Sequence, residues 1–107
     1  MGSQLTWDEV KRRANVRKHG LDFANAGWVL DSRWRMDVPD ARSAEVRIRS
    51  ISYALGVLAV LTVVHTPRRA AAGQSTARVI SFRHASQKER EAYDEWLQID
   101  HEDQDSQ

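Results

Sequence analysis

Several features are missing from this sequence. The chain of 107 residues contains no cysteine, which excludes a disulfide framework and a metal site built on thiolates. No charged-then-apolar leader opens the chain. The longest apolar run, from Val57 to Val64, is far shorter than the ~20 residues that cross a bilayer. These absences predict a soluble, cytoplasmic protein, and the length predicts one domain.

Positive charge is missing from the end of the chain. All 16 Lys and Arg lie in residues 1–90 beside eight Asp and Glu, a balance of +8, whereas residues 91–107 carry seven acids, a balance of −7. A basic body of this size indicates a polyanionic or acidic partner, although a small domain also needs charge for solubility. We expect one domain over residues 1–97 and a disordered acidic tail over 98–107.

Local signals predict an α+β fold. Thr6 and Glu9 have the spacing of a capping box and Gly20 suits a helix end, so a first helix is expected between them. Ser86 and Glu89 repeat the capping-box spacing and open a C-terminal helix. Other expected elements are a second helix at about 22–30, strands at 34–38, 45–53, 57–65 and 78–84, and a loop at 66–77. The predicted architecture is two N-terminal helices, an antiparallel sheet of three to four strands, and a C-terminal helix.

The first predicted helix carries a polar stripe beside an apolar one. Trp7, Val10 and Ala14 share one face at helical spacing. Lys11, Asn15 and His19 follow at i, i+4 and i+8 on an adjacent face. A cation, an amide and an imidazole along one helix edge can together bind a phosphate.

Two separated motifs make the chain resemble the BrnT family of toxins from type II toxin–antitoxin systems. The first is Trp7-Asp8, Lys11, Asn15, Lys18-His19-Gly20 and Phe23; the second is Arg78-Val79-Ile80-Ser81, Arg83, Ala85, Glu89-Arg90 and Tyr93; Glu45, Arg47 and Thr66 match between them. The resemblance implies a RelE-like fold and a metal-independent endoribonuclease that inhibits translation and growth. It also implies a BrnA-type antitoxin with a ribbon-helix-helix region, a 2:2 complex, contact with operator DNA only through that antitoxin, and no cofactor.

The residues that could cut RNA follow from the chemistry of the reaction. A ribose 2′-hydroxyl must be activated, the phosphorane neutralised and the leaving oxygen protonated. We expect catalysis from His19, Arg83 and Arg47. We expect RNA contacts from Lys11, Asn15, Lys18, Arg78 and Tyr93.

Each of these residues also has an ordinary structural explanation. His19 can serve as acid or base, or can cap the helix through the last carbonyls. Arg83 can clamp a phosphate or form a surface ion pair, and Arg47 can position Glu45 or pair with it at an edge. Tyr93 can stack on a base or pack in the core, and the lysines can hold a nucleic-acid backbone or solvate a helix face.

Strand geometry separates two of the arginines. Residues 78 and 83 lie on opposite faces of a regular strand, so Arg78 and Arg83 cannot line one pocket unless a bulge intervenes. We favour Arg83 for the phosphate, and expect Arg78 at a strand edge or an interface.

Two other functions remain open at this stage. One is a noncatalytic RelE-like module that binds an antitoxin and represses transcription with it. The other is a toxin directed at DNA gyrase, as in ParE relatives.

Overall fold

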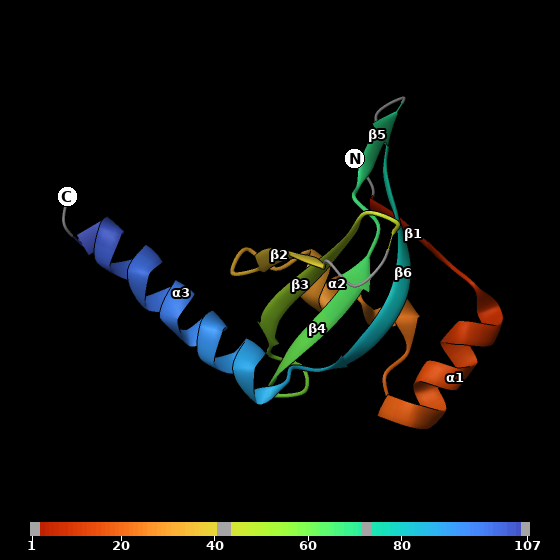
Figure 1. The fold of residues 1–107 in the computed structure, drawn as a ribbon, viewed down its shortest axis with the longest axis horizontal. Helices are drawn as coiled ribbons and strands as arrows, with labels where there is room; N and C mark the ends of the chain where they lie inside the picture. The colour runs from red at the N-terminus through yellow and green to blue at the C-terminus, as the bar shows by residue number, and fades with distance from the viewer. Residues whose placement is uncertain (1–2, 41–43, 72–73, 106–107) are drawn as a thin grey trace.

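A computed structural model describes residues 3–40, 44–71 and 74–105. Within these ranges the chain is α+β, with a six-stranded mixed sheet in the order β1-β6-β4-β3-β2 and β5 paired to β6 (Figure 1). The strands are β1 (Ser3–Trp7), β2 (Met36–Asp40), β3 (Arg47–Ala54), β4 (Ala59–His65), β5 (Arg69–Ala71) and β6 (Gln74–His84). The helices are α1 (Glu9–His19), the 3-10 helix η1 (Phe23–Asn25), α2 (Gly27–Leu30) and α3 (Gln87–Asp105).

The chain begins with a strand, which corrects two of our predictions. β1 pairs in parallel with β6, and Thr6 lies opposite Arg78, so the sheet is mixed and not purely antiparallel. Thr6 therefore belongs to β1 and does not cap the first helix. Asp8 is the N-cap instead, because its carboxylate accepts a hydrogen bond from the Lys11 backbone at 3.1 Å. The predicted end of α1 is confirmed, since Gly20 adopts a left-handed φ of 71° there.

The segment after α1 is less helical than predicted. Asp22 is an N-cap, as expected, but it opens only the 3-10 turn η1. The helix that follows, α2, spans four residues. The predicted 66–77 loop is likewise replaced by β5 and the start of β6, which pair in an antiparallel hairpin. Its connection, residues 72–73, lies outside the described ranges, as do residues 41–43.

The sheet separates two cores. On one face, here called the α1 face, η1 and α2 contribute Phe23, Val29 and Leu30 to a buried cluster with Val63 and Phe82 of the sheet. On the opposite face, the α3 face, a smaller cluster consists of Met36, Ile51, Ala85 and Tyr93, with Val38, Val60, Trp96 and Leu97 packed against it. α3 covers only part of this face and extends beyond the sheet (Figure 1).

The capping box that opens α3 is confirmed. The Ser86 backbone donates to the Glu89 carboxylate at 2.9 Å, and the Glu89 backbone donates to the Ser86 hydroxyl at 3.2 Å. The helix then continues to Asp105, where we expected disorder from residue 98. Its glutamates and glutamines favour a helix once a nucleus exists, and the capping box supplies that nucleus. The proposed domain boundary at residue 97 stays a prediction.

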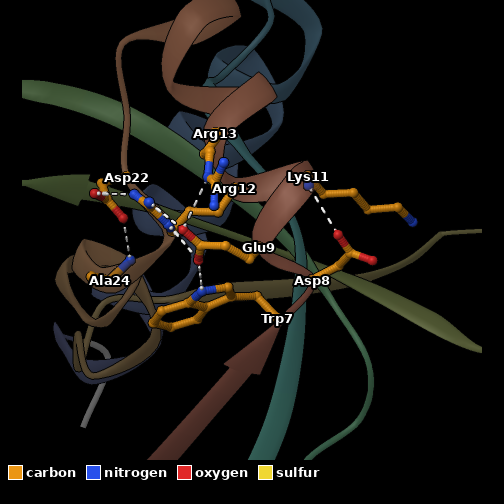
Figure 2. A network of polar contacts seen from close by, with 8 residues as sticks. All are labelled: Trp7, Asp8, Glu9, Lys11, Arg12, Arg13, Asp22 and Ala24. Atoms are coloured by element: carbon orange, nitrogen blue, oxygen red, sulfur yellow. Dashed lines mark hydrogen bonds and ion pairs between the residues drawn. The ribbon is translucent and has the colours of Figure 1, made fainter.

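An ion-pair network fixes the direction in which α1 leaves β1 (Figure 2). Glu9 accepts hydrogen bonds from the Arg12 guanidinium at 2.5 and 2.9 Å and from the Trp7 indole at 3.3 Å. The hydrogen bond from Arg12 is the main reason why the pKa of Glu9 is lowered to about 2. Arg12 also donates at 2.9 Å to Asp22. One arginine thereby links the start of α1 to the start of η1.

The face of α1 that contacts the sheet is the polar one. Val10 is 74% exposed, whereas Asn15 is buried. Of the apolar stripe that we predicted, Trp7, which lies in β1, packs against the core, and Val10 does not. No helix in the described part of the chain has both the length and the apolar character needed to cross a membrane.

Candidate functional site

A β-bulge in β6 brings Arg78 and Arg83, two arginines of the second motif, to one side of the sheet. Val64 pairs with Ser81 and His65 with Val79, which leaves Ile80 without a partner in β4. Val79 consequently lies on the α1 face with His65, while Arg78 and Arg83 both lie on the α3 face. The condition under which both arginines could serve one surface is therefore met. Our expectation of an edge position for Arg78 was too narrow.

A buried carboxylate organises one end of this surface. Glu89, 5% exposed, accepts two hydrogen bonds from the Arg83 guanidinium at 2.7 and 3.0 Å and one from Arg49 at 2.8 Å. Thr62 donates to the same carboxylate at 3.1 Å. We call Arg83, Glu89 and Arg49 the Glu89 bridge. The forked pairing fixes the plane of Arg83, which leaves one edge of the guanidinium for another anion.

The protonation of Glu89 follows from these donors. Burial by itself raises the pKa of the Glu89 carboxyl. Hydrogen bonds from Arg83, the Ser86 backbone and Arg49 outweigh burial and hold the pKa well below its ordinary value. Glu89 is thus ionised at neutral pH and its charge serves to hold two arginines.

His19 lies within range of the positive charge of Arg83. The Asn15 amide donates at 2.7 Å to the Phe82 carbonyl and accepts at 3.2 Å from the Phe82 backbone, which attaches α1 to the free edge of β6. One helical turn beyond Asn15, a rise of ~6 Å, brings His19 level with the end of β6. Burial lowers the pKa of His19, and the nearby positive charges of Lys18, Arg83 and His84 lower it further. The imidazole is therefore neutral at pH 7 and can accept a proton.

A second pair of arginines shares an exposed carboxylate. Glu45 accepts two hydrogen bonds from Arg78 at 2.8 and 2.9 Å and one from Arg47 at 3.4 Å. The hydrogen bond from Arg78 is the main cause of the lowered pKa of Glu45. We call these three residues the Glu45 bridge. It contains Arg47, so this predicted catalytic residue lies in the Glu45 bridge and not beside His19.

A cleft of about 730 Å³ adjoins the Glu45 bridge. Its wall contains both cationic and hydroxyl side chains. The lining residues are Thr6, Glu45, Val46, Thr66, Pro67, Arg69, Thr76, Ala77 and Arg78. We call it the threonine cleft.

Two predicted RNA-contacting residues are fully used in the fold. The Asn15 amide group also donates to the Leu21 carbonyl at 2.9 Å, so both of its donors and its oxygen are occupied. Tyr93 is 1% exposed; its hydroxyl donates to the Trp34 carbonyl at 2.8 Å and accepts from the Tyr53 backbone at 3.2 Å. Both residues are structural in this arrangement because a buried, satisfied group has nothing left to offer a ligand.

Lys11 and Lys18 remain on the exposed surface of α1, where they can contact a polyanion. The residue that the sequence reading missed is Arg49. Its only signal was the strand parity that it shares with Arg47, and that parity did not indicate which carboxylate it would reach from 40 residues away. Across the described parts of the chain, no group of three or more histidines and acids is placed to hold a metal ion.

An apolar groove of about 540 Å³ lies at the other end of the α3 face, lined by Ser32, Trp34, Tyr53, Leu55, Tyr93 and Leu97. Beside it, the connection from β3 to β4 exposes Leu55 (80%) and Leu58 (74%). Leu58 adopts a left-handed φ of 53°, a conformation that costs a residue with a branched side chain about 1–2 kcal/mol.

The fold and the site define an α+β domain with a cationic surface, a neutral histidine and paired arginines, as enzymes that act on a phosphodiester require. The family model of the ribonuclease toxin BrnT of type II toxin–antitoxin systems matches residues 7–89. The chain belongs to the BrnT family, and this membership indicates a ribonuclease toxin that has an antitoxin partner. A comparison with curated proteins found no match.

Proposed function

We propose that this protein is an endoribonuclease toxin that cleaves cellular RNA without a metal ion, at a site formed by His19, Arg83 and Arg49. The observation that carries the proposal is that His19, whose pKa is lowered, lies within range of the charge of an arginine whose plane is fixed by a buried carboxylate. Its family membership and the predominance of positive charge before α3 support an RNA substrate. An RNA target agrees with action in the cytoplasm.

The chemistry assigns a role to each group. Neutral His19 removes the proton of a ribose 2′-hydroxyl, and the oxygen attacks the adjacent phosphorus. Arg83 and Arg49 bind the non-bridging oxygens, whose negative charge grows as the phosphorane forms. The bond to the 5′-oxygen then breaks, and that oxygen takes up a proton, which protonated His19 can return through water. The products are a 2′,3′-cyclic phosphate and a 5′-hydroxyl. Lys11 and Lys18 hold the RNA backbone without reading its sequence.

The test is induced expression with RNA profiling and growth measurement, together with cleavage by the purified protein in the presence of a chelator. His19→Ala and Arg83→Ala should each reduce cleavage by about 10²-fold or more. Arg33→Ala is the matched control, because Arg33 is an exposed arginine over Trp34 and does not contribute to the charge around His19. Full cleavage by both site variants would overturn the assignment, and a loss of cleavage with chelator would overturn metal independence.

We further propose that the antitoxin is of the BrnA type, with a ribbon-helix-helix region, in a 2:2 complex that reaches operator DNA only through the antitoxin. The apolar groove and the exposed Leu55 and Leu58 support a protein partner, since such side chains are depleted on surfaces that stay in water. Co-purification with the product of a neighbouring reading frame tests the pairing. Leu55→Ser should weaken the complex and leave RNA cleavage unchanged.

A further inference from the structure

The threonine cleft lies outside the proposed catalytic group, which consists of His19, Arg83 and Arg49. It lies on the same face of the sheet as Arg83 and Arg49. Thr6, Thr76 and Arg78 share that face, because Thr6 is opposite Arg78 and Thr76 is two residues before it on β6. Arg69 joins them because it is opposite Thr76. The cleft therefore offers two guanidinium groups and two threonine hydroxyls to a ligand that lies along the sheet.

β3 connects this cleft to the catalytic group. Arg47 belongs to the Glu45 bridge and Arg49 to the Glu89 bridge. The two residues are two positions apart on one strand, so their side chains leave the same face about 7 Å apart. A chain of cations thus extends from Arg83 through Arg49 and Arg47 to Arg78. A polyanion held at one end can continue to the other.

A ligand can displace the Glu45 carboxylate from its arginine partners, whereas the Glu89 carboxylate is buried and stays in place. The Glu45 side chain is 43% exposed and its partner Arg78 is 47% exposed. Exposed ion pairs are weak because water and salt screen them. Both hydrogen bonds come from one nitrogen, Nη2 of Arg78, which lies between the two Glu45 oxygens. The carboxylate therefore occupies the place that phosphate oxygens would take at that nitrogen. Glu45 is therefore a displaceable stand-in for a phosphate.

We propose that the threonine cleft is a subsite for a phosphate and ribose of single-stranded RNA that flank the cleaved bond, and that this phosphate displaces Glu45 from Arg78. The inference rests on the proposed ribonuclease function. The threonine hydroxyls bond the ribose or the phosphate, and Arg69 adds a second charge. With this subsite, the affinity of the protein for RNA depends on the length of the RNA. A short RNA contacts only the catalytic group and does not reach the threonine cleft.

Binding of uncleavable 2′-O-methyl RNAs of about 4 and about 16 nucleotides to the full-length protein tests the subsite. Arg78→Ala should weaken binding of the longer RNA about tenfold and leave the shorter one unchanged. It should also reduce the slope of log affinity against log salt by about 1. Glu45→Gln should strengthen binding of the longer RNA several-fold, since it removes the competing charge. Arg33→Ala, which removes the same charge elsewhere, is the control.

Three results would overturn the subsite. Equal weakening by Arg78→Ala and Arg33→Ala would show only the effect of net charge. Equal effects on the short and long RNA would place Arg78 at the catalytic group. Unchanged RNA binding together with weaker antitoxin binding would assign the cleft to the protein partner. Failure of the proposed function looks different: the parent protein would then cleave no RNA, whatever the variants bind.

Discussion

The two bridges have the same chemical plan, an arginine pair around one glutamate, but different surroundings. Glu89 is 5% exposed and holds Arg83, Arg49 and Thr62 together, with its own backbone tied into the capping box of α3. Glu45 is exposed and pairs with Arg78 and Arg47 at the mouth of a cleft. Burial turns the first carboxylate into a fixed support for Arg83. Exposure makes the second one exchangeable, as a binding surface requires.

The largest expected difference between the bridges is in stability. Glu89→Gln should lower the free energy of unfolding by about 3–5 kcal/mol, because it leaves two guanidinium groups without their counter-charge in a buried place. Glu45→Gln should leave the Tm nearly unchanged. Chemical denaturation at pH 7 measures both. Similar losses for the two variants would mean that burial does not distinguish the bridges.

The pH dependence of this loss has a definite sign. The pKa of Glu89 is lowered in the folded protein, so its stabilisation is fully present above the unfolded value of 4.5 and disappears as the pH falls below it. The difference between parent and Glu89→Gln should therefore shrink between pH 5 and about pH 3. A difference that persists unchanged at about pH 3 would contradict the ionised state of Glu89.

The next largest effect is on RNA cleavage, and it depends on the planar shape of the arginine side chain rather than on its charge. Lysine cannot form the forked pairing, so Arg83→Lys should reduce RNA cleavage about 10²-fold. Arg78→Lys keeps the positive charge at an exposed site and should reduce cleavage less than about tenfold. Single-turnover cleavage of one RNA by both variants makes the comparison. Equal losses of cleavage in the two lysine variants would mean that Arg83 acts only through its charge. The orientation of its guanidinium by Glu89 would then not matter for cleavage.

The smallest effect concerns His19. Its pKa is lowered below 6.5 by burial and by the charges of Lys18, Arg83 and His84. As a base it works in the neutral form, so cleavage should be lost as the pH falls through that lowered pKa. Lys18→Gln removes one repelling charge and should move this acidic limb upward by less than about one pH unit. Arg33→Gln, which removes a distant charge, should not move the limb.

Much of the local structure could be predicted because it depends on neighbours in the sequence. The Gly20 end of α1, the Asp22 cap and the Ser86–Glu89 capping box need only residues a few positions apart. The pairing of β1 with β6 could not be predicted in this way, because nothing in Ser3–Trp7 specifies a partner about 70 residues later. The prediction that Thr6 caps α1 was wrong for that reason. Thr6 is paired within β1, and Asp8, which is an equally good capping residue, takes the N-cap position.

The candidate site shows the same division. The motifs predict a common function for His19 and Arg83, and in the fold the charge of Arg83 acts on His19. Their catalytic roles stay a prediction. Asn15 and Tyr93 belong to the same motifs but serve the fold, a distinction visible only in their burial and in their hydrogen bonds to Phe82 and Trp34.

The sequence by itself determined the residue types, the ends of the helices and the segregation of positive from negative charge, because these depend on composition and short spacing. Only the tertiary structure decided which face each arginine takes and which carboxylate it meets. A single extra residue, Ile80, changes the alternation of β6 and places Arg78 on the same face as Arg83. The register around that bulge is defined by the pairing of β6 with both β4 and β1, which is a property of the whole sheet.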